Sequence, residues 1–259
     1  MPNKRISELE KLSELILKMR GKGAKKRMAK DTKSPNASAD KRQKTDEAVQ
    51  TDQMGNSEVE PIRLLDTQDS ANPDIWIISD SILFWAGVRA ANTGKDNLKL
   101  PQDLSIGWFG VRGMKWEHFH REIQRRMLQY KNPRLILLNL GGNDLASASI
   151  YSLRRTISRE ITYLFSTFQS TVIVWLDILQ RRVWRARAKE ANKTTENKRR
   201  RINLIGHREV ATNSRGRFFH VDIDYKTAGF FRPDGIHLSD VGLEFTLDKI
   251  RDTLIEYLG

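Results

Sequence analysis

The feature that most constrains the fold is a short apolar run that ends abruptly in small polar residues. Residues 74–78 read Asp-Ile-Trp-Ile-Ile, and Ser79-Asp80-Ser81 follow directly. Four consecutive β-branched or aromatic residues leave no room for a helical period, so the run predicts a strand buried on both faces. Open α/β sheets carry their chemistry at the carboxyl ends of such strands. The sequence therefore directs attention to Ser81.

Ser81 has two interpretations. A serine at the end of a buried strand can present an exposed nucleophilic hydroxyl, but serine is also a common helix N-cap, and the isolated pattern favours the cap. Residues 82–85, Ile-Leu-Phe-Trp, predict that the turn opens into a helix with an apolar wall. The choice between the two depends on what else reaches this position.

The rest of residues 73–259 alternates between short apolar runs and apolar stripes of helical spacing. Such alternation predicts a sheet of parallel strands with helices on both faces. Further strands are predicted at residues 103–109, 134–140, 171–176 and 218–221. Helices are predicted at residues 119–130, 153–168, 182–210 and 243–254.

The first 72 residues have a different character. Ser7 and Glu10 form a capping box, and apolar residues follow at heptad spacing, so residues 1–20 predict a short amphipathic helix. This helix is equally consistent with self-association and with a coiled-coil remnant. Residues 21–72 lack periodicity and predict a disordered charged linker, with basic clusters first and acidic residues after them. The basic clusters resemble a bipartite nuclear-import signal or form a solvated tail.

Composition limits the classes of function. The 259 residues carry a formal net charge of +13, which predicts attraction to polyanions, RNA or DNA in particular. The chain contains no cysteine, which excludes disulfides and thiolate chemistry. No membrane-spanning run and no signal peptide are recognisable, so we expect an intracellular protein, cytoplasmic or nuclear, rather than a secreted one. We expect no cofactor and no metal.

The positive charge is densest between residues 181 and 201. Phosphate binding and a solvated helix face explain this segment equally well, and the former would be sensitive to salt. Trp184 lies within this segment, and packing against other side chains is its favoured role, ahead of stacking on a base. The predicted nucleic-acid-binding residues are Arg181, Arg182, Arg185, Arg187, Lys198, Arg199, Arg200 and Arg201.

Polar clusters follow three of the predicted strands. They are residues 110–113 (Gly-Val-Arg-Gly), 141–144 (Gly-Gly-Asn-Asp) and 234–237 (Asp-Gly-Ile-His). Each has a simpler interpretation. The glycines of the first cluster only turn the chain, Asn143 and Asp144 cap the helix near Ile150, and Asp234 and Gly235 form a turn. In a parallel sheet, however, all three loops share one edge with Ser81. Together they contain the groups needed for acyl transfer.

The predicted chemistry is that of a serine esterase. The Ser81 hydroxyl attacks an ester carbonyl, and His237 accepts its proton. Asp234 holds the imidazole tautomer that leaves Nε2 free for the serine. The backbone N–H groups of Ser81 and Gly113, with the Asn143 side-chain amide, form the predicted oxyanion hole.

These residues resemble the SGNH hydrolases, also called GDSL-type esterases. The four family blocks supply Ser, Gly, Asn and His, which correspond here to Ser81, Gly113, Asn143 and His237. The resemblance covers residues 74–259 and implies a flavodoxin-like α/β/α sandwich with a five-stranded parallel sheet, a metal-free Ser-His-Asp mechanism, and esters of apolar or acetyl groups as substrates. Ser79 stands where the family has glycine, so a Cβ is present at the tight turn before Ser81.

The segments around residues 108–116, 183–187 and 234–240 are also similar to esterase-like domains in open reading frames of some animal retrotransposons. Two other functions stay open. One is an SGNH-fold module with weakened catalysis that acts in nucleic-acid binding or as an interaction protein of a mobile element. The other is a divalent-metal nuclease, for which the strand-end carboxylates would be the ligands: Asp80, Asp144, Asp177 and Asp234.

Overall fold

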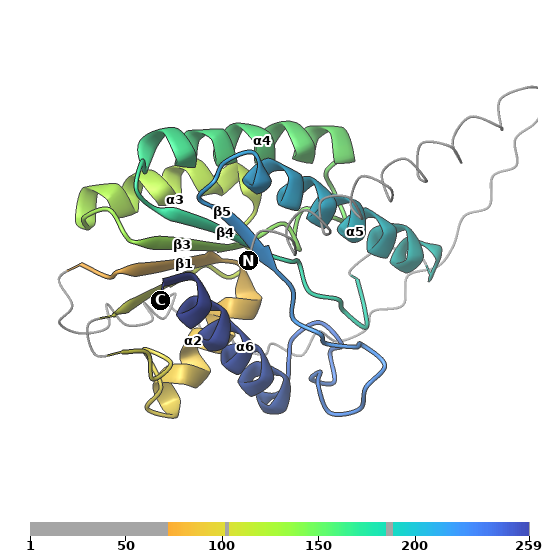
Figure 1. Cartoon of the computed structure of the whole chain (residues 1–259). Helices are drawn as coiled ribbons and strands as arrows, with labels where there is room; N and C mark the ends of the chain where they lie inside the picture. Colours follow the sequence, from red (N-terminus) through yellow and green to blue (C-terminus); the bar gives the residue numbers. More distant parts are fainter. Residues whose placement is uncertain (1–71, 102–103, 185–188, 259) are drawn as a thin grey trace, which may run out of the picture. The chain divides into compact units, whose positions relative to one another are not determined.

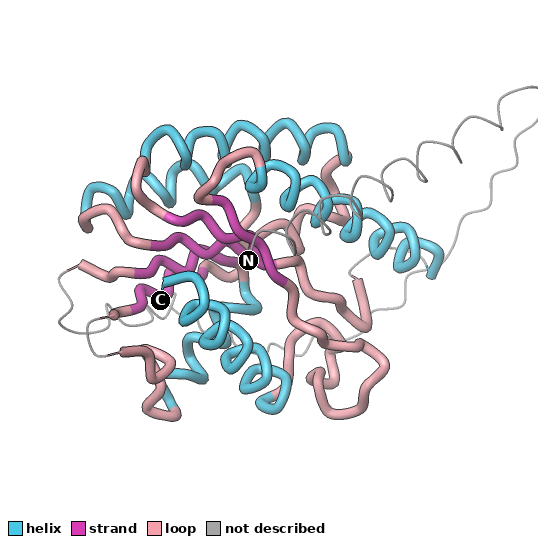
Figure 2. The backbone as a smooth tube through the Cα atoms, in the orientation of Figure 1, coloured by secondary structure: helices cyan, strands magenta, loops and turns pink. Residues whose placement is uncertain are grey.

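The computed structural model describes residues 72–101, 104–184 and 189–258, which form a five-stranded parallel sheet between two layers of helices (Figures 1 and 2). The strand order is β2-β1-β3-β4-β5. The strands are β1 (Ile75–Ser79), β2 (Ile106–Gly110), β3 (Leu135–Asn139), β4 (Val172–Leu176) and β5 (Gly216–Phe219). The helices are α2 (Ser81–Asn92), α3 (Trp116–Gln129), α4 (Ile150–Thr167), α5 (Lys189–Ala211) and α6 (Asp240–Leu258).

The predicted fold class is confirmed. All four pairs of neighbouring strands are parallel, and β1 pairs with β2 on one side and with β3 on the other. The direction in which the chain adds strands therefore reverses between β1 and β3, which is the flavodoxin-like order. In such sheets the crevice outside the carboxyl ends of these two strands is the usual ligand site. Ser81 follows β1 directly.

Alternate residues of β1 enter the two cores of the domain. Ile75 and Ile77 pack with α2 and α6, while Trp76 and Ile78 pack with α3, α4 and α5. All four side chains are fully or almost fully buried. Because successive side chains of a strand point to opposite faces, a strand covered on both sides must be apolar at every position. This explains the uninterrupted apolar run that marks β1 in the sequence.

One helix boundary differs from the prediction. The pattern of residues 182–210 predicts a single helix, but α5 begins at Lys189, and residues 181–184 are not helical. The Val183 N–H donates to the Gly235 carbonyl at 3.0 Å, and the Trp184 N–H donates to the Asn192 side chain at 3.0 Å. These contacts hold the segment beside the 234–237 loop and outside the helix.

The helix predicted for residues 1–20 and the linker predicted for residues 21–72 lie outside the described residues, apart from Asn72, and stay predictions. Among the described helices, none combines the length and the apolar character that crossing a bilayer requires.

Candidate active site

Ser81 is the first residue of α2, and its neighbour Asp80 is the N-cap. The Asp80 carboxylate accepts the Ile82 N–H at 3.1 Å, so the interpretation of Ser81 as the helix cap is wrong. Because Asp80 caps the N-terminus of α2, the Ser81 hydroxyl is not needed as a cap. It makes no hydrogen bond to another described residue, and Ser81 is 9% exposed. The serine therefore has a free hydroxyl at the carboxyl end of β1.

Ser79 is accommodated without distortion of this corner. It is fully buried, it continues the parallel pairing with Gly110 of β2 and Asn139 of β3, and its hydroxyl donates to the Asp80 carbonyl at 3.3 Å. The chain still turns into α2 with Asp80 as its cap. A Cβ at this position is thus compatible with the strand-to-helix turn that positions Ser81.

Asp234 and His237 form a close pair in the loop between β5 and α6. Asp234 Oδ2 lies 2.6 Å from His237 Nδ1, while Oδ1 accepts the backbone N–H groups of Ile236 and His237 at 2.9 and 3.0 Å. Partial burial raises the pKa of Asp234, but these hydrogen bonds outweigh it and lower the pKa to about 2. Asp234 is therefore a carboxylate at neutral pH, and the imidazole is held through Nδ1.

His237 is one of the groups that influence the pKa of Asp80, the residue before Ser81. Burial raises the pKa of Asp80, whereas Arg181, the Ile82 N–H and His237 lower it. Ser81 and His237 are not hydrogen-bonded to each other in this structure. Catalytic hydrogen bonds are often long before a substrate binds, so this geometry is compatible with proton transfer from Ser81.

Asn143 and the turn containing Gly113 reach the same corner. The Val111 N–H donates to the Ser79 carbonyl at 2.9 Å, which fixes the 111–114 turn against the end of β1. The Asn143 side-chain amide donates to the Met114 carbonyl at 3.1 Å and contacts Asp80 Oδ2 at 3.4 Å. Gly113 has φ +75°, a left-handed conformation that residues with a Cβ rarely adopt. Three loops thus converge beside Ser81.

A buried ion pair at this corner was not expected from the sequence. Arg181 Nη2 lies 3.5 Å from Asp80 Oδ2, and both side chains are less than 10% exposed. The guanidinium also lies 5.0 Å from the centroid of the Trp184 ring, so the packing role favoured for Trp184 is confirmed. A Cβ on Gly142 would come within 2.5 Å of Arg181 Nη2. The glycine therefore makes room for the arginine.

The predicted nucleic-acid-binding set is corrected by these contacts. Arg181 and Arg199 are buried, and Arg199 donates to the Ile178 carbonyl at 2.6 Å and pairs with Glu196. Lys198 donates to the carbonyls of Leu145 and Ala148. These three cations fasten α5 and the 181–184 segment to the domain instead of facing solvent.

Three of the remaining members of that set, Arg182, Arg200 and Arg201, are exposed. Arg185 and Arg187 lie outside the described residues.

The strand-end carboxylates do not gather as a metal site would require. Asp144 accepts the Trp116 N–H at the start of α3, and burial raises its pKa to about 7. Asp177 lies 2.5 Å from His207 Nε2. Within the described ranges, no three or more acidic or histidine side chains are grouped to hold a metal ion. The predicted cap of α4 by residues 143–144 is also wrong, because Ser149 caps that helix.

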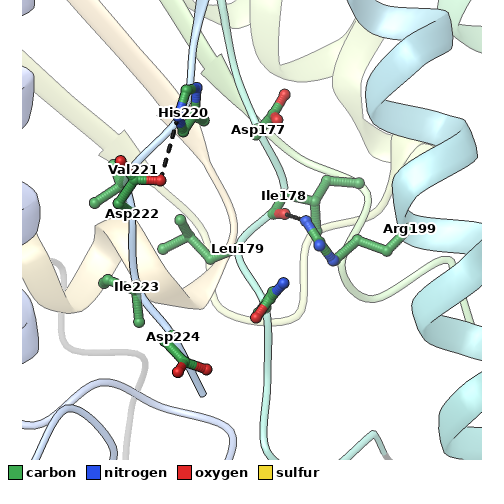
Figure 3. A pocket seen from close by; sticks show the side chains of 10 residues that line it. Asp177, Ile178, Leu179, Arg199, His220, Val221, Asp222, Ile223 and Asp224 are labelled. Atoms are coloured by element: carbon green, nitrogen blue, oxygen red, sulfur yellow. Dashed lines mark hydrogen bonds and ion pairs between the residues drawn. The ribbon is translucent and has the colours of Figure 1, made fainter. Parts of the chain in front are cut away.

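A polar cavity of about 380 Å³ lies at the same edge of the sheet, between the segments that follow β4 and β5 (Figure 3). Its lining includes residues 177–180, residues 220–224 and Arg199. His220 Nε2 lies 3.3 Å from Asp222 Oδ1 on one wall. The sequence gives no signal for this cavity, because its two walls are at least forty residues apart in the chain.

Comparison with known proteins finds similar folds among solved structures. No protein-family model and no curated protein matches the sequence. Among solved structures, a GDSL-like lipase from Bacteroides thetaiotaomicron VPI-5482 is 14% identical, with a TM-score of 0.53 over 70% of this chain and 87% of that chain. The three-layer α/β fold of this chain is similar to that of this GDSL-like lipase.

Two further structures agree with this fold. The psychrotrophic esterase EstA from Pseudoalteromonas sp. is 14% identical, with a TM-score of 0.51 over 71% of this chain and 98% of that chain. A structure described as a platelet activating factor from Streptococcus pneumonia is 19% identical, with a TM-score of 0.58 over 73% of this chain and 87% of that chain. The resemblance to retrotransposon-borne domains stays a prediction.

Proposed function

We propose that this chain is a serine esterase that hydrolyses carboxylic esters with Ser81, His237 and Asp234. The observation that carries the proposal is the Asp234–His237 pair in the loop after β5, in which Asp234 Oδ2 lies 2.6 Å from His237 Nδ1. The GDSL-type fold supports it, since Ser81 follows β1 at the point where the strand order reverses.

The proposed reaction begins when Ser81 Oγ attacks the carbonyl carbon and His237 Nε2 accepts the hydroxyl proton. The leaving alcohol takes that proton as the tetrahedral intermediate collapses to an acyl-enzyme. Water, deprotonated by the same imidazole, then releases the acid and restores the serine. Asp234 stays ionised throughout, because its pKa of about 2 lies far below the working pH.

Negative charge on the carbonyl oxygen would be met by the N–H groups of Ser81 and Gly113 and by the Asn143 amide. The Asn143 contact to Asp80 is long, at 3.4 Å, so this hydrogen can be redirected to an oxyanion at little cost while the bond to the Met114 carbonyl is kept. EstA was solved in a form inhibited by monoethylphosphonate, which supports testing this chain with phosphorus-based serine reagents.

The test is labelling with a fluorophosphonate probe together with hydrolysis of 4-nitrophenyl esters of graded acyl length. We expect one label per chain, lost in Ser81→Ala and retained in Ser105→Ala, a second serine of the same domain. Labelling that survives in Ser81→Ala, or the absence of both labelling and hydrolysis in the folded wild-type protein, would refute the proposal. The ester series would also show whether the acyl site prefers acetyl or longer apolar groups.

A second function, nucleic-acid binding, is favoured by the distribution of charge between the two helical layers. The layer of α3, α4 and α5 presents nine exposed cations among the described side chains and one exposed anion, Glu117. On the opposite layer, α6 exposes more acidic than basic side chains. The exposed cations of the first layer are Arg121, Arg125, Arg154, Arg155, Arg159, Lys193, Arg200, Arg201 and Arg208. We infer that this layer contacts the phosphates of single-stranded RNA, with or without ester hydrolysis in the same chain.

This second proposal predicts a salt-dependent affinity. Neutralising Arg154, Arg155 and Arg159 on α4 together by glutamine is expected to weaken RNA binding and to lower the slope of log K against log salt by about 2, as loss of three phosphate contacts implies. Filter binding or anisotropy across a salt series measures both quantities, with Lys249→Gln on the opposite layer, at α6, as the control for loss of a surface charge elsewhere. An affinity independent of salt would contradict the proposal, as would a triple variant that binds like the wild type.

A further inference from the structure

Trp85 lies one helical turn beyond Ser81 on the same face of α2. Residues four apart on a helix are neighbours, and the rise over four residues is about 6 Å. The ring is partly buried against the core that α2 and α6 share, and it contacts Phe84 edge-on at 5.2 Å between centroids. Trp85 therefore forms a rigid wall beside the position that the reacting carbonyl would occupy.

Two guanidinium groups from different loops lie close to this ring. Arg112 Cζ lies 5.7 Å from the ring centroid, and Arg232 Cζ lies 5.1 Å from it. Arg112 directly precedes Gly113, whereas Arg232 belongs to the histidine loop and its N–H donates to the His237 carbonyl at 2.9 Å. The distance between the two Cζ atoms is therefore at most the sum of these two distances to the ring centroid. They come from the two loops that would flank a bound substrate.

Neither Arg112 nor Arg232 has an ion pair with a carboxylate in the described part of the chain. The acidic groups nearest to the site have partners already, since Asp80 pairs with Arg181 and Asp234 with His237. Two neighbouring cations without a counter-ion repel each other, and contact with the Trp85 ring offsets only part of this cost. An anion placed between them would be bound by charge-assisted hydrogen bonds from two planar donor groups.

We infer that the ester substrate carries a phosphate or carboxylate a few bonds from its scissile carbonyl, and that Arg112 and Arg232 bind this group over Trp85. The inference rests on the proposed esterase function, and it specifies the substrate class of that site. The one-turn offset between Ser81 and Trp85 sets the separation, because the anion and the carbonyl must reach positions about 6 Å apart along α2. A neutral ester would leave both guanidinium groups without a partner.

The test compares pairs of esters that differ in charge but little in size. For an anion on the acyl side, the pair is mono-4-nitrophenyl glutarate and 4-nitrophenyl pentanoate. For an anion on the alcohol side, it is acetylglycerol 3-phosphate and glycerol monoacetate, followed by acetate release. In one of the two pairs, we expect the kcat/KM of the charged ester to be at least about tenfold higher than that of the neutral ester, as a charge-assisted contact implies. The ratio of these two kcat/KM values should fall as salt is added.

The variants connect this preference to the two arginines. We expect the double variant Arg112→Gln/Arg232→Gln to lose the preference for the charged ester. The double variant Arg112→Lys/Arg232→Lys should keep part of it. The control Lys249→Gln should have the same ratio of charged-ester to neutral-ester kcat/KM as the wild type. Equal kcat/KM values within both pairs would overturn the inference, and so would a preference that survives in the double glutamine variant.

A binding measurement separates this inference from the proposed function. If the wild-type protein hydrolyses no ester, the esterase proposal fails, and calorimetric titration with glycerol 3-phosphate then tests the anion site alone. Binding that is lost in Arg112→Gln/Arg232→Gln would support the site. The absence of binding to the folded wild-type protein would reject it.

Discussion

Replacing Asp234 with asparagine is expected to lower kcat for ester hydrolysis by about four orders of magnitude while the fold is retained. In the wild-type protein the carboxylate faces His237 Nδ1 at 2.6 Å and requires a proton on that nitrogen. An asparagine can instead turn its NH₂ group toward Nδ1 and stabilise the other tautomer. Nε2 would then carry the proton and could not accept one from Ser81.

The carboxylate itself should not appear in the pH profile. Its lowered pKa of about 2 means that the charged form, and the stability it contributes, is present above about pH 4 and is lost only as the pH falls toward 2. Loss of activity between pH 5 and 8 would therefore not arise from Asp234. The asparagine variant should be slow across this whole range instead of recovering at one end of it.

Asp222→Asn is the matched control for this prediction. Asp222 also lies beside a histidine at the same edge of the sheet, at 3.3 Å from His220, but it is largely exposed. Its substitution is expected to change kcat little. Comparable losses in the two variants, or an Asp234→Asn protein that keeps a tenth or more of the wild-type kcat, would contradict the assignment of Asp234.

The sheet, and the edge at which its loops gather, were predictable from sequence because both follow from simple physical rules. β1 and β3 are covered on both faces, so they are continuous apolar runs that a helix would not require. Once the strands are parallel, the loops after them must share one edge. Ser81, Asn143 and Asp234 were therefore assigned to one edge although up to 153 residues separate them in the chain.

The local assignments that failed involve choices that only tertiary contacts decide. Asp80 and Ser81 are both good N-cap residues, and which of them caps α2 depends on where the strand ends. The basic run 181–201 gives no sign of which cations are buried. Arg181 is buried because it faces Asp80, more than a hundred residues earlier in the chain, and Arg199 because it reaches the Ile178 carbonyl.

The pair formed by Asp80 and Arg181 leads to the second large effect, which is on stability. Arg181→Met keeps much of the side-chain volume but leaves the Asp80 carboxyl buried without its counter-ion. Breaking a buried pair from one side typically lowers the free energy of unfolding by about 3–5 kcal/mol. Urea denaturation at pH 7.5 should show this loss, whereas Arg182→Met, at the exposed neighbouring position, should change stability by less than about 0.5 kcal/mol.

The dependence on pH separates lost charge compensation from lost packing against Trp184. Burial already raises the pKa of Asp80, and removing Arg181 raises it further, so the folded variant holds a proton that the unfolded chain has released. Stability of Arg181→Met should therefore fall as the pH rises above about 4, where an unfolded aspartate ionises. Adding Asp80→Asn keeps an oxygen to cap Ile82 and removes the buried charge, so the double variant should lose this slope. A deficit that is equal at pH 4.5 and 7.5 would instead show that Arg181 stabilises the domain through packing alone.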